Sequence, residues 1–117
     1  MIAIKDLSFQ IGSKKILHQL NFTAYPKEIL TIIGPNGAGK SSLLKLISKE
    51  IAYTTGSIKL QGKELKSFRS IDLAKFRAVL PQQNYLSINL RVFDIVMMGR
   101  YPFFDFKPRG IDIEITN

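Results

Sequence analysis

The chain has 117 residues, of which 45% are hydrophobic, so it is large enough for one small domain with an apolar core. It has 17 basic and 9 acidic residues, a formal net charge of +8, and no cysteine. These numbers exclude global disorder, disulfide bonds and metal sites built from thiolates. No apolar run reaches the ~18 residues of a membrane-spanning helix, and the N-terminus lacks the features of a signal peptide. We therefore expect a cytosolic protein that meets a membrane only through a partner or its surface.

The distribution of the basic residues bears on the kind of partner. Nucleic-acid binding is typical of a basic stripe with interleaved aromatic residues. Here the positive charges are scattered from Lys14 and Lys15 through Lys59 to Arg77. We therefore expect no nucleic-acid partner and favour a solvated surface that attracts phosphate ligands. A polyanion or an anionic membrane is the alternative.

The first part of the chain predicts several short strands. Apolar residues alternate from Met1 to Gln10, a polar turn follows, and residues 15–20 and 21–25 are rich in strand-forming residues. A turn at Pro26 leads into Ile29–Ile33, which is apolar and is predicted to be a further strand. A simple alternating β-α unit would have one strand before its first helix, and this chain has more.

A glycine-rich turn and an apolar-periodic run follow this strand. Gly34, Gly39, Lys40 and Ser41 fit the phosphate-loop (Walker A) pattern G-x-x-x-x-G-K-[ST]. Glycines let successive backbone N–H groups point inward at an anion, and the N-terminus of the next helix adds its dipole. Lys40 would reach the β- and γ-phosphates, and the Ser41 hydroxyl would bind Mg²⁺. The sequence therefore predicts a nucleotide triphosphatase that uses Mg²⁺.

The residues expected to hold the nucleotide are contiguous: Gly34, Pro35, Asn36, Gly37, Ala38, Gly39, Lys40, Ser41 and Ser42. The helix that follows should run from about Gly39 to Glu50, with one buried apolar face. Ser57–Gly62 alternates like a strand. Asp72 is expected to cap a short helix that ends near Phe76.

Gln82 is the second candidate site residue. Residues 77–81 predict a buried strand closed by proline, and Gln82 follows it directly. Ligands gather at the carboxyl ends of strands in open α/β sheets. The Gln82 amide oxygen could join the magnesium shell or hold the attacking water, so Gln82 is a catalytic and metal-binding candidate beside Lys40 and Ser41. An ordinary polar loop is the alternative.

The C-terminal part offers no clear catalytic group. Residues 90–100 predict a helix, residues 101–110 irregular structure, and residues 111–115 alternate as a strand does. Asp94 and Asp105 do not end an apolar strand, as a Walker B magnesium acid would. The methionines and aromatic residues of this part suit either a core or a partner surface.

Gly34–Ser42, preceded by several antiparallel strands, resembles the phosphate loop of the nucleotide-binding subunits of ATP-binding-cassette (ABC) transporters. Gly56–Gly62 resembles the segment after that family's first helix, and residues 77–82 resemble the approach to its Q-loop, which places the Q-loop glutamine at Gln82 rather than Gln83. The resemblance implies an α/β fold, a P-loop NTPase core with an N-terminal antiparallel β subdomain. Ile11 stands where many members carry an aromatic residue that stacks on adenine, so only apolar contact is expected there.

The resemblance also implies how the chain is divided. Residues 1–62 would hold the antiparallel strands and Walker A, and residues 63–117 the connection, the Q-loop and the start of the helical subdomain. The sequence has no Leu-Ser-Gly-Gly-Gln signature, no Walker B acidic pair and no switch histidine. We therefore expect the N-terminal part of one ABC ATP-binding domain, truncated before the signature motif, that binds ATP without hydrolysing it.

Residues 77–82 together with Met98–Pro102 are similar to the ATPases of importers for haem, ferric siderophores and cobalamin, most of all those for haem. This implies integral-membrane permease subunits and a second copy of the ATPase as partners, and a periplasmic or surface binding protein indirectly. It also implies a peripheral location on the cytoplasmic side of the cell (inner) membrane. The alternatives are an exporter ATPase, a ribosome-associated cassette protein or a non-catalytic nucleotide-binding module. The sequence does not identify the cargo.

Overall fold

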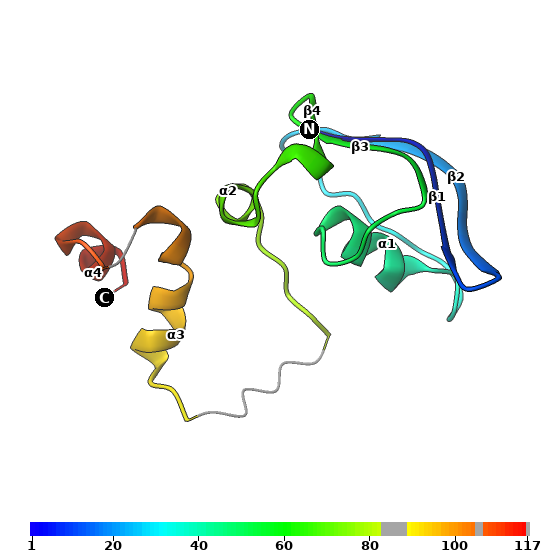
Figure 1. The fold of residues 1–117 in the computed structure, drawn as a ribbon. Coiled ribbons are helices and arrows are strands. Elements are labelled where there is room, and N and C mark those ends of the chain that lie inside the picture. Colours follow the sequence, from blue (N-terminus) through cyan, green and yellow to red (C-terminus); the bar gives the residue numbers. More distant parts are fainter. Residues whose placement is uncertain (83–88, 105–106, 117) are drawn as a thin grey trace. The chain divides into compact units, whose positions relative to one another are not determined.

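The computed structural model describes residues 1–82, 89–104 and 107–116 (Figure 1). The chain forms two compact units, Met1–Phe68 and Arg69–Asn117. Within the described residues, no helix is long and apolar enough to cross a membrane.

The first unit is built on a four-stranded antiparallel sheet with the strand order β2-β1-β3-β4. Its strands are β1 (Ile2–Ile11), β2 (Lys14–Ala24), β3 (Thr55–Leu60) and β4 (Lys63–Glu64). The predicted antiparallel strands are therefore present, although β2 runs through both segments that the sequence suggested as separate strands. Strand β1 is central, and its buried Ile4 lies opposite Phe22 of β2 and Ile58 of β3.

A paired irregularity interrupts the ladder between β1 and β2. Asp6 and Gln19 have φ values of 48° and 44°, in the left-handed region. The Asn21 side chain joins them, because its Oδ1 accepts from Asp6 N at 2.8 Å and its Nδ2 donates to Gln19 O at 2.9 Å. Gly56, with φ 91°, approaches the same place so closely that a methyl group there would collide with the Asp6 carbonyl.

Helix α1 (Lys40–Ile47) follows the phosphate loop. Its Leu43 and Leu46 are buried, as the apolar periodicity predicted. The helix ends earlier than expected because Lys49 adopts φ 60°, a left-handed C-terminal turn. The Lys49 ammonium then donates to the carbonyls of Lys66 and Phe68, which ties this turn to the short helix η1 (Leu65–Ser67) and the residue after it.

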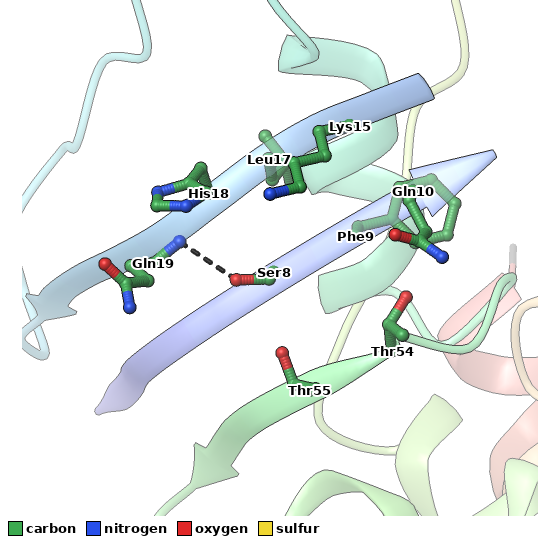
Figure 2. A pocket seen from close by; sticks show the side chains of 9 residues that line it. All are labelled: Ser8, Phe9, Gln10, Lys15, Leu17, His18, Gln19, Thr54 and Thr55. Atoms are coloured by element: carbon green, nitrogen blue, oxygen red, sulfur yellow. Dashed lines mark hydrogen bonds between the residues drawn. The ribbon is translucent and has the colours of Figure 1, made fainter. Parts of the chain in front are cut away.

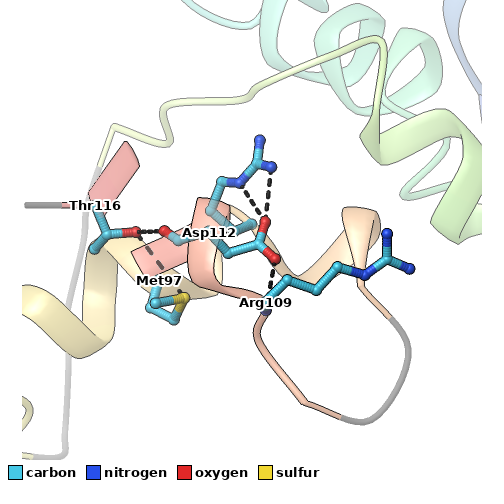
Figure 3. Close-up of polar contacts among 5 residues, drawn as sticks. Met97, Arg109, Asp112 and Thr116 are labelled. Carbon is cyan, nitrogen blue, oxygen red and sulfur yellow. Dashed lines mark hydrogen bonds and ion pairs between the residues drawn. The ribbon is translucent and has the colours of Figure 1, made fainter. Parts of the chain in front are cut away.

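The second unit is helical. Its elements are α2 (Ser70–Ala74), α3 (Val92–Met98), η2 (Tyr101–Phe103) and α4 (Gly110–Thr116). An ion pair joins α4 to the segment after α3: buried Asp112 accepts from Arg100 Nε at 2.9 Å and Nη2 at 2.7 Å. Figure 3 shows the polar contacts of Asp112, among them the hydrogen bond from Arg109 N. The helix at residues 110–116 contradicts the strand-like alternation at residues 111–115. Asp112 favours the helix through two further hydrogen bonds. Its carboxylate accepts from Arg109 N at 2.9 Å, and its own N–H donates to Arg109 O, so both bonds stabilise the first turn of α4.

Each α-helix of the second unit begins with the same local pattern, arginine followed three residues later by aspartate. In α2 and α3 the arginine is the residue before the helix, and its guanidinium donates twice to the aspartate: Arg69 to Asp72, and Arg91 to Asp94. Asp72 therefore lies in the first turn of α2, and the prediction that it caps this helix is wrong because Arg69 is at the N-cap position. Carboxylates at this position face the positive end of the helix dipole.

Two predicted strands are not strands in the structure. Ile29–Ile33 and residues 77–81 carry no regular secondary structure. Most of their residues are exposed as well: Ile29 is 96% and Leu80 is 87% accessible, which contradicts a buried strand. A strand exists only where a neighbouring segment supplies hydrogen bonds, and none of the described segments pairs with these two.

Candidate phosphate-binding site

The loop Gly34–Ser42 leads into α1 and belongs to the first unit. Ala38 N donates to Pro35 O at 3.2 Å and closes a turn around Asn36 and Gly37. Gly37 and Gly39 have φ values of 84° and 90°. Both values favour glycine, so the pattern residue Gly39 is required by backbone conformation alone.

The N-terminus of α1 presents its backbone donors at this loop. The first intrahelical bond runs from Leu43 N to Gly39 O at 2.8 Å, so the N–H groups of residues 40–42 have no intrahelical acceptor. No acidic side chain lies in the first turn. Ser41 is exposed there and Ser42 is half-buried. The positive end of the α1 dipole is therefore not neutralised by an acidic side chain of the first turn, so this helix end can bind an anion.

Lys40 lies across the start of the loop. Its Nζ donates to Gly34 O and Pro35 O, both at 2.7 Å, and its side chain is half-buried. The ammonium is thus held beside the loop by two neutral carbonyls. An incoming phosphate would offer anionic acceptors, which attract the ammonium more strongly than neutral carbonyls do.

Strand β2 supplies a wall of this site that the sequence did not indicate. A methyl group built on Gly39 would lie 2.9 Å from Leu17 Cδ2, 3.0 Å from Ile16 Cγ2 and 3.1 Å from Ile16 O. The pattern marks Gly39 as a loop glycine but gives no hint of its neighbours, because contacts between distant segments leave no local signal.

Gln82 lies in the second unit, where it is exposed and does not follow a strand. That Gln82 forms one site with Lys40 and Ser41 stays a prediction. Gln83, the alternative Q-loop residue, lies outside the described residues, as does Asp105. Ile11 is 61% exposed at the end of β1, next to Gly12 with φ 57° in the turn.

A shallow hollow of about 220 Å³ lies on the sheet, apart from the predicted site residues. Figure 2 shows that it is bounded by β1, β2 and the start of β3. His18, the one histidine of the sequence, lines it as an exposed side chain, and Ser8 and Thr55 line it too. In the parts of the chain that the structure describes, no group of acidic or histidine side chains could hold a metal ion.

Asp94 and Asp112 of the second unit each lie in the first turn of a helix. The Arg91 guanidinium lowers the pKa of Asp94 through its hydrogen bonds, against a smaller opposing effect of burial. The Arg109 N–H and then the Arg100 guanidinium lower the pKa of Asp112. Both groups therefore stay ionised and paired, and Asp94 has the structural role of a helix-start residue.

Comparison with known proteins decides the family. The sequence model of the ABC transporter family matches residues 17–113. The chain belongs to the ABC transporter family. The solved "ATP binding subunit of ABC transporter" superposes with a TM-score of 0.78 at 24% identity, covering 88% of this ABC chain and 42% of that one. This confirms the predicted fold class, a P-loop core with an N-terminal antiparallel subdomain.

Curated relatives of this ABC chain carry names from import systems. The hemin import ATP-binding protein HmuV of Bordetella avium is 44% identical over 108 residues, which cover 92% of this chain and 41% of the relative. HmuV of Gloeobacter violaceus is 42% identical over 114 residues, covering 97% and 40%. The petrobactin import ATP-binding protein YclP of Bacillus subtilis is 38% identical over 103 residues, covering 88% and 41%. The chain spans about two-fifths of the length of these relatives.

Proposed function

We propose that this chain binds ATP with Mg²⁺ and forms part of the ATP-binding, energy-coupling subunit of an importer for haem or a ferric siderophore. The observation that carries the proposal is the loop at residues 34–42, which ends on the donor-rich N-terminus of α1 with the Lys40 ammonium at its edge. The names of the relatives, which concern hemin and petrobactin import, support the class of cargo.

Different groups of the loop would bind different parts of a triphosphate. The backbone N–H groups of residues 40–42 would donate to phosphate oxygens at the N-terminus of α1, where the helix dipole favours negative charge. Lys40, whose Nζ donates to the carbonyls of Gly34 and Pro35, would donate to phosphate oxygens instead when the nucleotide is bound. Mg²⁺, when bound, neutralises phosphate charge, and the exposed Ser41 hydroxyl fits it as a ligand. Gln82 is proposed as a second ligand and as the residue that orients the attacking water.

Hydrolysis requires more than these residues. The sequence has no signature motif, Walker B acids or switch histidine, and we propose that the chain by itself binds ATP without turning it over. In the assembled transporter, the partners would be permease subunits, a second ATPase copy and, indirectly, a periplasmic or surface binding protein. The chain would then lie at the cytoplasmic face of the membrane, and we propose no nucleic-acid partner.

Isothermal titration of the chain with MgATP tests the site. Lys40→Ala should remove most of the affinity, because no other side chain of the loop carries positive charge. Lys45→Ala is the matched control, since Lys45 is an exposed lysine on the last turn of the same helix. Equal affinity in Lys40→Ala and the unchanged chain would overturn the phosphate-loop assignment. Co-purification with a membrane permease supports the importer assignment, whereas crosslinking to ribosomes contradicts it.

A further inference from the structure

The hairpin of β1 and β2 reaches the phosphate loop at Gly39. The space beside Gly39 is filled by Leu17 and Ile16, as the distances of 2.9 to 3.1 Å from a methyl group built there show. Leu17 is itself half-buried and lies opposite Phe9 of β1. The contact therefore connects the loop to the middle of the antiparallel sheet.

This contact bears on affinity because the loop is otherwise exposed. Residues 33–38 are all accessible, and glycine residues retain more backbone freedom than others. The structure has Gly39 at φ 90°, and a triphosphate requires one conformation of the loop so that several N–H groups can donate to it together. The apparent dissociation constant rises in inverse proportion to the fraction of molecules in that conformation. A side chain that packs on Gly39 raises this fraction before the ligand arrives.

We propose that Leu17, together with Ile16, is a positioning residue for the phosphate loop. It acts through Gly39 and touches no ligand atom itself. The inference rests on the proposed function, since the loop must bind a triphosphate for its preorganisation to be measured. It adds a residue from β2 that lies outside the phosphate-loop pattern and outside every motif considered above.

Leu17→Ala and Leu20→Ala form a matched pair for the test. Both leucines lie on β2, both are half-buried, and each faces a residue of β1: Leu17 opposite Phe9 and Leu20 opposite Leu7. We expect Leu17→Ala to weaken MgATP binding about five- to tenfold, as for a loop that is competent in ~10–20% of molecules. Leu20→Ala should stay within about twofold when both are measured well below their melting temperatures.

Inorganic triphosphate separates positioning of the loop from contact with the base. It occupies the phosphate loop alone, so the loss caused by Leu17→Ala should be the same for triphosphate as for ATP. Leu17→Met keeps the side-chain volume and should bind as the unchanged chain does. It also tests the proposal if the alanine variant does not fold.

The outcomes separate the two proposals. If the unchanged chain binds neither ATP nor triphosphate, the proposed function fails. If it binds both and Leu17→Ala matches Leu20→Ala, the positioning role is wrong. A loss that appears with ATP but not with triphosphate also contradicts it, because Leu17 would then contact the nucleoside.

Discussion

Three glycines of the phosphate loop differ in what a methyl group would meet, which makes Gly39→Ala a quantitative test of the site. At Gly39 the backbone is left-handed, with φ 90°, and the added methyl group would lie 2.9 to 3.1 Å from its nearest neighbours. At Gly37, φ is 84° but no atom lies within 4 Å. At Gly34, φ is ordinary and the nearest atom is Ala38 Cβ at 3.4 Å, a normal contact.

The magnitudes follow from these three environments. The left-handed conformation costs an L-residue about 1–2 kcal/mol, and overpacking adds about 1–3 kcal/mol. Gly39→Ala should therefore destabilise the binding conformation of the loop by about 2–5 kcal/mol and Gly37→Ala by about 1–2 kcal/mol. Gly34→Ala should destabilise it hardly at all. Because the loop is exposed, the free chain can relax out of the strained conformation. Most of the cost should then appear in binding and little in the melting temperature.

The assay is titration with MgATP and with inorganic triphosphate, beside thermal melting of the same samples. We expect the affinity to fall in the order Gly34→Ala, Gly37→Ala, Gly39→Ala, with the last at least about thirtyfold weaker than the unchanged chain, since each 1.4 kcal/mol is about tenfold. Equal losses at Gly37 and Gly39 would refute the role of the β2 contact. Tolerance at Gly39 equal to that at Gly34 would refute the left-handed conformation itself.

Two further predictions concern the fold. Leu46→Ala, at a side chain with 0% exposure, should lower the free energy of unfolding by about 2–5 kcal/mol in urea melts, whereas Leu44→Ala at 55% exposure should change it little; similar effects would contradict the buried face of α1. Asp112 has a lowered pKa in the folded chain, so its contribution is present above the unfolded pKa of about 3.9 and is lost as pH falls through the folded value. Asp112→Asn should therefore lower stability at pH 7 and flatten its decrease between about pH 5 and 2, measured by urea melts across that range; an unchanged pH profile would contradict the buried ion pair with Arg100.

The arginine–aspartate pairs at the helix starts are a sequence signal that was outweighed by a more familiar one, the apolar alternation. Arg69, Arg91 and Arg109 each precede an aspartate by three residues, and each pair lies at the first turn of a short helix. The spacing is visible in the sequence, but the apolar alternation around Asp112 suggested a strand. The hydrogen bonds at the helix start outweighed that alternation, since period-two spacing is informative only where one face of a strand is buried.

The sequence by itself determined the local features of this protein. The phosphate-loop pattern, a helix that starts at about Gly39, the alternation of β1 and β3 and a helix within residues 90–100 depend on residues close in the chain, so they could be predicted. The tertiary structure alone decided the rest. Ile29–Ile33 is apolar and strand-like in composition, yet it is exposed and unpaired among the described segments, because a strand needs a partner that its own residues cannot supply. The packing of Leu17 on Gly39 likewise joins residues that only folding brings together.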